Sequence, residues 1–258
     1  MSLEAVGLWQ FALIVAVVVV AGFVHGAIGI GFPLIATPLT ALVLDVKTAI
    51  VVVAPVTLVI VVLSVFKGGG WREAVARFWF LPLGMAVSSY AGTRLLIGAK
   101  AAPFLLVLAL LILVYLALDR LKRGESAFVQ RHRVPIGVGV GLLGGLFEST
   151  ANVAVPPLII YLMLLGTAPL AIVQTLNLCF TVGKSVQVGT WAMHGNVSAT
   201  LWMSAALLAI PAVVTLFVGM RLRERVDAPT YRRWLRGALW LMAALLIGQY
   251  AYLEFPAS

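Results

Sequence analysis

The sequence predicts an all-α polytopic membrane protein, on the evidence of its composition and its charge spacing. Of the 258 residues, 62% are hydrophobic and only 10% are charged, whereas an average soluble domain is about 45–50% apolar and about 25% charged. The charged residues cluster and leave uncharged runs, most of them near or above the roughly 18 residues that mark a membrane helix. These runs cover 5–44, 48–66, 78–93, 101–118, 134–147, 149–183, 185–220 and 237–253. No stretch is long enough for a separate soluble catalytic or nucleotide-binding domain, so the composition disfavours a soluble enzyme.

Ten apolar segments follow from these boundaries. In chain order the segments run over about 8–24, 27–44, 48–66, 76–98, 102–118, 135–147, 152–166, 169–192, 198–220 and 235–253. The first segment has no basic residue before it and no convincing cleavage site, so we expect it to be retained rather than removed as a signal peptide.

The basic residues gather on one side of these segments if the N-terminus lies outside the membrane and each segment reverses the chain. The loops between segments 3 and 4, 5 and 6, and 9 and 10 then face the cytoplasm. Those loops carry 14 of the 18 Lys and Arg residues, namely Lys67, Arg72, Arg77, Arg120, Lys122, Arg123, Arg131, Arg133, Arg221, Arg223, Arg225, Arg232, Arg233 and Arg236. The positive-inside rule therefore predicts both termini outside, and it explains the net charge of +9 without nucleic acid binding. A lipid-binding role for 120–133 is an alternative.

The chain carries an internal duplication. Gly22, Gly26 and Pro38 correspond to residues 119 positions later, and Ala91–Leu95 corresponds to Val218–Leu222 at an offset of 127. The sequence therefore predicts a membrane repeat over 1–118, a cytoplasmic basic linker over 119–134 and a second membrane repeat over 135–258. A unit of five segments ends on the side opposite its start, so the second repeat enters the membrane inverted, as in many secondary transporters.

Each repeat opens with a Gly- and Pro-rich stretch, Gly26–Pro33 in the first and Gly144–Asn152 in the second. We expect these residues to break the helices. The pieces in the second repeat, about 13 and 15 residues long, would extend only about 20 and 22 Å, short of a roughly 30 Å hydrocarbon core. Broken helices at matching positions of two repeats indicate a transport site. Close helix packing through Gly137, Gly141 and Gly145 is the alternative, and both can hold.

This pattern resembles the TauE/SafE-type sulfite exporter family. It consists of the duplicated Gly-rich breaks followed by prolines, the Gly195-Asn196-Val197 turn, and the Gly-x-Arg ends at Gly92–Arg94 and Gly219–Arg221. The resemblance covers nearly the whole chain, although Glu148-Ser149-Thr150 stands where more glycine is expected. It implies a bacterial inner-membrane transporter of sulfite, organosulfonates or related organic anions, in which the termini that the positive-inside rule places outside would be periplasmic.

The eighth segment carries a polar stripe. At 100° per residue one face of this helix displays Gln174, Asn177, Thr181, Lys184, Gln187 and Trp191. Lys184 lies between two long uncharged runs, and an ionisable group inside a membrane is a functional-site hypothesis by default. Its ammonium could hold a sulfite or sulfonate oxygen. The alternatives are an ion pair with Glu148 or a lysine that reaches the membrane surface.

Two residues in the helix breaks are candidates for proton coupling. Glu148 is the other charged residue deep in an apolar region, and a carboxylate beside an anion site repels substrate unless it is protonated or paired. His25 lies in the first break and titrates near neutrality, although a lone histidine there can simply satisfy a local hydrogen bond.

The predicted substrate site lies near the midplane between the two breaks and the eighth segment. Its residues are Lys184, Asn177, Thr181, Gln187, Ser149, Thr150 and Asn152 from the second repeat and Gly29, Gly31 and Thr37 from the first. We expect a proton-coupled, alternating-access transporter that uses no cofactor. The polar stripe exists only in the second repeat, which we expect to supply specificity.

Several other functions and sites are disfavoured. Leu178 stands where a P-loop ending at Lys184 needs glycine, and the three histidines lack metal-ligand spacing. Cys179 is alone, so no intramolecular disulfide forms. An anion channel is the nearest alternative, and a membrane-embedded enzyme is weaker. The expected partners are a small anionic substrate and the lipid bilayer, without nucleic acid, and the sequence leaves a homodimer open.

Overall fold

The structure, a computed structural model, describes residues 7–98, 125–152, 154–195 and 197–223, with Thr230, Arg233, Gly237, Trp240 and Ala244 as single positions. Throughout this part of the chain the regular elements are helices, which confirms the all-α prediction. They are α1 (Leu8–Ile28), α2 (Phe32–Ala41), α3 (Val46–Gly68), α4 (Trp71–Phe78), α5 (Phe80–Gly98), α7 (Ala127–Arg131), α8 (Arg133–Ala151), α9 (Val155–Leu164), α10 (Pro169–His194) and α11 (Ala199–Arg223). The predicted segments 102–118 and 235–253 lie outside the described residues, apart from Gly237, Trp240 and Ala244.

Five of these helices, α1, α3, α5, α8 and α11, are long and apolar enough to cross a membrane. Helix α10, with 26 residues, would extend about 39 Å, so it also has the length to cross. Its composition is more polar because it carries the stripe from Gln174 to Trp191. The chain is therefore a multi-pass membrane protein whose most polar long helix is α10.

Helices α2 and α9 are too short to cross. Each has 10 residues and extends about 15 Å, so the predicted segments 27–44 and 152–166 are helical only in part. The first break lies where expected, because Gly29 and Gly31 adopt positive φ angles of 87° and 111° between α1 and α2. Such angles are accessible to glycine at little cost.

The second break lies later than expected. The predicted sixth segment ends at residue 147, whereas α8 continues to Ala151 and the chain turns at Asn152, whose φ is 58°. A glycine inside a helix costs only about 1 kcal/mol, and here it allows close packing. A Cβ at Gly145 would collide with Ser88 and with the Met85 carbonyl of α5. The alternative of small-residue packing therefore accounts for these glycines.

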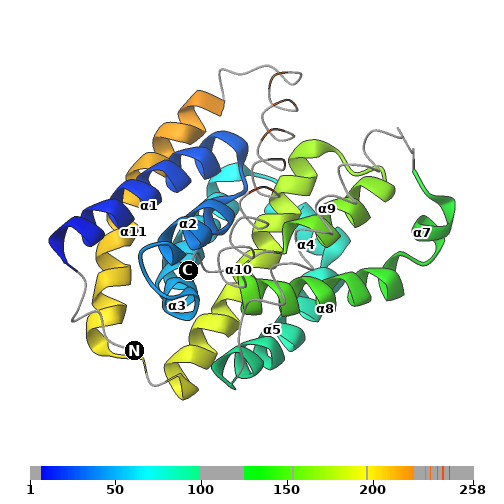
Figure 1. The fold of residues 1–258 in the computed structure, drawn as a ribbon. Coiled ribbons are helices and arrows are strands. Elements are labelled where there is room, and N and C mark those ends of the chain that lie inside the picture. Colours follow the sequence, from blue (N-terminus) through cyan, green and yellow to red (C-terminus); the bar gives the residue numbers. More distant parts are fainter. Residues whose placement is uncertain are drawn as a thin grey trace.

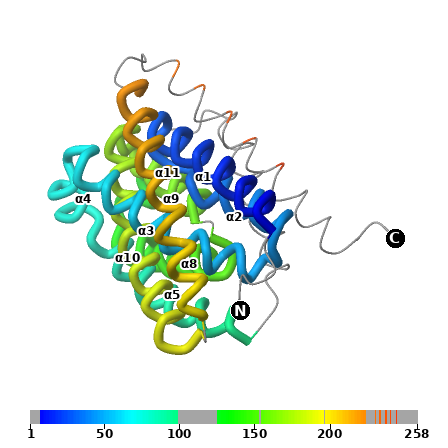
Figure 2. The backbone as a smooth tube through the Cα atoms, turned by 90° about the vertical axis from the view of Figure 1, so that its left-hand side faces the viewer, coloured from blue at the N-terminus to red at the C-terminus, as the bar shows by residue number. Residues whose placement is uncertain are grey.

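The long helices form two tight pairs, α1 with α11 and α5 with α8, and α3 and α10 lie between them (Figures 1 and 2). Both pairs meet through glycine. A Cβ at Gly26 would collide with the α11 backbone around Gly219, and a Cβ at Gly84 would press on the α8 backbone around Gly141. One buried apolar cluster centres on α8, α9 and α10, and a second centres on α1, α3 and α11.

The elements of the two halves correspond in position. The end of α1 and the end of α8 lie 123 residues apart, and so do the starts of α2 and α9 and the starts of α3 and α10. The pair α1–α11 corresponds to α8–α5, and α3–α11 corresponds to α10–α5. At this spacing His25 occupies the position of Glu148, and Gly29 that of Asn152.

Candidate functional site

Lys184 is completely buried on α10 and is surrounded by oxygen atoms. Its ammonium donates to Asn152 Oδ1 at 2.7 Å and to Gln187 Oε1 at 2.6 Å. It also lies 3.8 Å from Glu148 Oε1 and 3.5 Å from the Glu148 carbonyl oxygen. The ion pair with Glu148, which the sequence offered as an alternative role for Lys184, is therefore present. We call Lys184, Glu148, Asn152 and Gln187 the lysine network.

The Glu148 carboxylate has few partners. Its side chain is buried on α8, and neither carboxylate oxygen accepts a hydrogen bond. It lies against Gly183 of α10, where a Cβ would collide with Oε2. Gly183 therefore makes room for the carboxylate beside Lys184. The sequence pattern does not predict that Gly183 leaves this space, although Gly183 directly precedes Lys184.

Asn152 joins the two halves of the protein at the second break. Its Nδ2 donates to Thr37 Oγ1 of α2 at 3.0 Å and reaches the Ile50 carbonyl of α3 at 3.4 Å. Its Oδ1 accepts from Lys184, and Gln187 Nε2 donates to the Ser149 carbonyl at 2.9 Å. The structure thus brings Thr37 together with the lysine network.

Replacing Asn152 by glycine is expected to lower the free energy of unfolding by about 1–3 kcal/mol, because Lys184 loses a buried acceptor. Glycine retains the backbone conformation with φ at 58°. Alanine does not favour it, so Asn152→Ala should be less stable than Asn152→Gly by about 1 kcal/mol. Thermal unfolding in detergent measures both changes. Equal stabilities of the two variants would show that this backbone conformation carries no constraint.

Three predicted hydroxyl groups bond within their own helices. Ser149 donates to the Gly145 carbonyl, Thr150 to the Leu146 carbonyl and Thr181 to the Asn177 carbonyl, at 2.7 to 2.8 Å. Ser149 also lies against Gly92 of α5, where a Cβ would collide with its hydroxyl. These hydroxyls therefore do not donate to the lysine network in this conformation.

A second polar cluster surrounds the first break. Asn177 Nδ2 donates to the Gly29 carbonyl at 2.8 Å, and Asn177 Oδ1 has no hydrogen-bond partner. The Phe32 N–H donates to His25 Nδ1 at 3.2 Å, so the neutral ring carries its hydrogen on Nε2, which lies 3.2 Å from Ser64 Oγ. Along α10, Asn177 is about 10 Å from Lys184. The residues predicted as one site therefore form two clusters on one face of α10.

A family model described as "Sulfite exporter TauE/SafE" matches residues 14–246. The chain belongs to the TauE/SafE family. Searches of curated proteins and of solved structures find no match. Family membership confirms the resemblance and makes the chain a membrane transport protein of a sulfite exporter family, and the matched range contains both polar clusters.

One further residue of this TauE/SafE protein has an unpaired polar atom. Trp191 is 2% exposed, and its indole N–H has no hydrogen-bond partner. It lies two turns beyond Lys184 on the same face of α10. The predicted site omitted it, although it belongs to the polar stripe. Within the described residues, no group of three His, Cys, Asp or Glu could hold a metal ion.

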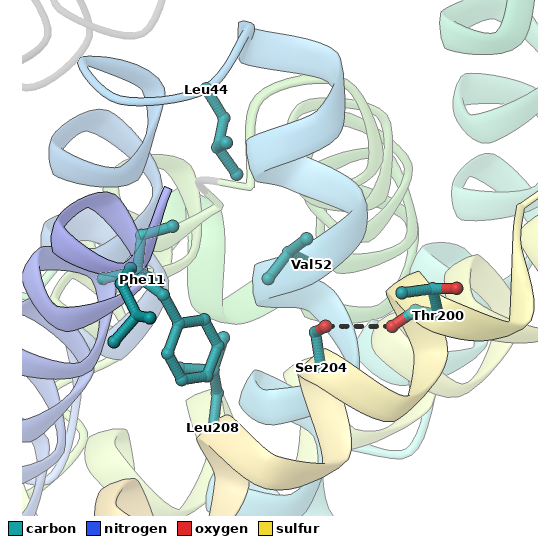
Figure 3. Close-up of a pocket in the computed structure, with 8 residues that line it drawn as sticks. Phe11, Leu44, Val52, Thr200, Ser204 and Leu208 are labelled. Atoms are coloured by element: carbon teal, nitrogen blue, oxygen red, sulfur yellow. Dashed lines mark hydrogen bonds between the residues drawn. The ribbon is translucent and has the colours of Figure 1, made fainter. Parts of the chain in front are cut away.

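Among the cavities lined by described residues, two lie against these helices, and neither is lined by the lysine network. One, of about 320 Å³, lies between α1, α3 and α11 and is lined mainly by apolar side chains such as Phe11, Val52 and Leu208 (Figure 3). Ser204 in this cavity donates to the Thr200 carbonyl of its own helix. The other, of about 400 Å³, lies beside Gln174 at the start of α10. The lysine network is closed off from both.

Proposed function

We propose that the protein is a secondary transporter that moves a small sulfur-containing or organic anion, such as sulfite or a sulfonate, across the bacterial inner membrane. The observation that carries this proposal is the buried ammonium of Lys184 inside a membrane protein of the TauE/SafE family. A buried charge in a membrane is costly and needs a counter-charge. In this structure Glu148 supplies that counter-charge.

The Glu148 carboxylate is the contact that an anion can replace most easily. It lies 3.8 Å from the ammonium, whereas Asn152 and Gln187 accept hydrogen bonds from the same ammonium at 2.7 and 2.6 Å. An oxyanion that took the place of the carboxylate would accept a hydrogen bond from Lys184 and keep the charge balanced. The amides of Asn152 and Gln187 then hold the ammonium in place.

Protonation of Glu148 couples this exchange to a proton. When Glu148 binds a proton, Lys184 loses its counter-charge, and the bound anion then supplies a new one. Binding of the proton to Glu148 therefore favours binding of the anion to Lys184. The titratable group that acts on Glu148 is Lys184, and Glu148 in turn acts on Cys179, which also lies on α10. From α5, Met85 approaches the same place, and Ser89 donates to the Gly145 carbonyl of α8.

His25 is the second proposed coupling residue. Its neutral ring accepts the Phe32 N–H, and Asn177 and Arg223 are the polar groups that act on it from α10 and α11. A protonated ring could not accept that hydrogen bond, so protonation would loosen the first break. The same hydrogen bonds also support the alternative that His25 simply satisfies local groups.

Alternating access would move one half of the protein against the other. The proposal of two inverted five-segment repeats is supported by the matching helix boundaries and by the exchange of helix contacts between the halves. The links from Asn152 to Thr37 and from Asn177 to Gly29 cross between the halves and would have to open in turn.

Both termini are proposed to be periplasmic because the basic loops then face the cytoplasm. A homodimer stays a prediction.

The test measures flux of labelled sulfite and of a sulfonate into proteoliposomes, with and without a pH gradient. The wild-type protein is expected to accumulate anion when a gradient is applied, and Glu148→Gln is expected to lose that dependence on pH. Saturable accumulation against a gradient excludes a channel, whereas flux that only equilibrates supports one. Absence of flux for sulfite, sulfonates and carboxylates, from protein shown to be folded, would overturn the substrate class.

A further inference from the structure

We propose that the cavity beside the start of α10 is a vestibule that binds the transported oxyanion before it reaches Lys184, with Arg77 as its cationic ligand. This proposal rests on the proposed transport function and adds a separate site to it. The cavity lies between the α3–α4 connection, α4 and the first turns of α10. Its volume of about 400 Å³ falls in the range of small-molecule sites.

The cavity lies at the end of the polar stripe. Gln174, which lines it, is the first residue of that stripe and is 4% exposed. Lys184 is ten residues further along α10, so about 15 Å of helix separates the two residues. An anion in the cavity therefore lies next to the polar face that leads to the lysine network.

One lining side chain ties α10 to α3 at this cavity. Gln174 Nε2 donates to the Val65 carbonyl of α3 at 2.5 Å. Gly68 makes room for this amide, since a Cβ at Gly68 would come within 2.7 Å of Gln174 Oε1. Breaking one hydrogen bond would free the amide to turn toward an anion.

The charges around the cavity favour an anion. Arg77 lines it, and within the described residues no carboxylate lies within 4 Å of its guanidinium, which instead lies over the Phe78 ring. Glu73 lines the cavity one turn earlier, whereas Lys67 and Arg72 flank it. Arg77 supplies the positive charge among the described residues that line this mouth, and its attraction for anions weakens as salt is added.

The matched test compares Arg77→Gln with Arg72→Gln. Both arginines lie on α4 and both substitutions remove one charge, but Arg72 lies over the Trp71 ring and does not line the cavity. Sulfite flux is measured in proteoliposomes of known orientation, with substrate on either face. Arg77→Gln is expected to raise KM about 10-fold when sulfite is added on the side of the membrane that carries the basic loops, and not when it is added on the other side. The same variant should show a weaker salt dependence of KM and an unchanged Vmax. Arg72→Gln should change KM by less than about 2-fold, and Arg77→Lys should restore most of the affinity.

Sulfite binding to the detergent-purified protein, measured by calorimetry, separates this proposal from the transport function. If binding depends on Arg77 but no flux occurs, the anion site at Arg77 stands, whereas the transport function and the role of the site as a vestibule fail. If wild-type flux occurs but Arg77→Gln and Arg72→Gln behave alike, or if KM rises equally from both faces, the vestibule is overturned. Absence of both flux and Arg77-dependent binding overturns both proposals.

Discussion

Replacing Lys184 by methionine is expected to abolish anion transport, with flux falling at least about 100-fold, and to destabilise the protein. Methionine fills a similar volume but leaves Glu148, which accepts no hydrogen bond, as a buried carboxylate without a counter-charge. Removing one partner of a buried ion pair costs about 3–5 kcal/mol. Flux assays and thermal unfolding in detergent measure the two effects.

The double variant Lys184→Met/Glu148→Gln separates the two effects. Both substitutions are close in shape to the original side chains, and together they leave no unpaired charge, so most of the lost stability should return. Transport should stay absent because the anion still lacks its ammonium. Recovery of transport in the double variant would show that Lys184 only balances Glu148, and the proposed anion ligand would then be wrong.

The sequence predicts the parts of the fold that depend on hydrophobicity and charge. Long uncharged runs produce α1, α3, α5, α8 and α11 because an apolar stretch of that length has no other stable environment than a membrane or a core. The positions of the helix breaks are harder to predict from the sequence, because glycine can either turn the chain or stay helical and allow close packing. Gly29 and Gly31 turn the chain, whereas Gly145 stays helical and lets α8 approach α5.

The candidate site is predictable only along one helix. The 3.6-residue period places Asn177, Lys184 and Gln187 on one face of α10, and the structure has all three buried there. The period says nothing about which residues of other helices meet that face. The contact of Asn152 with Thr37 depends on packing between the halves, 115 residues apart in sequence. The division into two clusters arises for the same reason.

The close contact between Glu148 and Gly183 predicts that a larger residue at position 183 impairs transport. Gly183→Ala is expected to reduce transport at least about 10-fold, because the new Cβ would occupy the place of the carboxylate and come within 3.2 Å of Met85 Cε. Glu148 cannot retreat with its backbone, since α8 is held against α5 at Gly145. The carboxylate must therefore turn away from Lys184. Overpacking of this kind costs about 1–3 kcal/mol.

Gly189 provides the matched control on the same helix. It lies six residues further along α10, and nothing lies within 4 Å of a Cβ built there. Alanine is the better helix former by about 1 kcal/mol, so Gly189→Ala should leave transport unchanged and raise stability slightly. If Gly183→Ala also transported normally and kept the wild-type pH dependence, the carboxylate would not need its place beside Lys184. The proposed exchange of Glu148 for the anion would then fail, even if Lys184 itself proved essential.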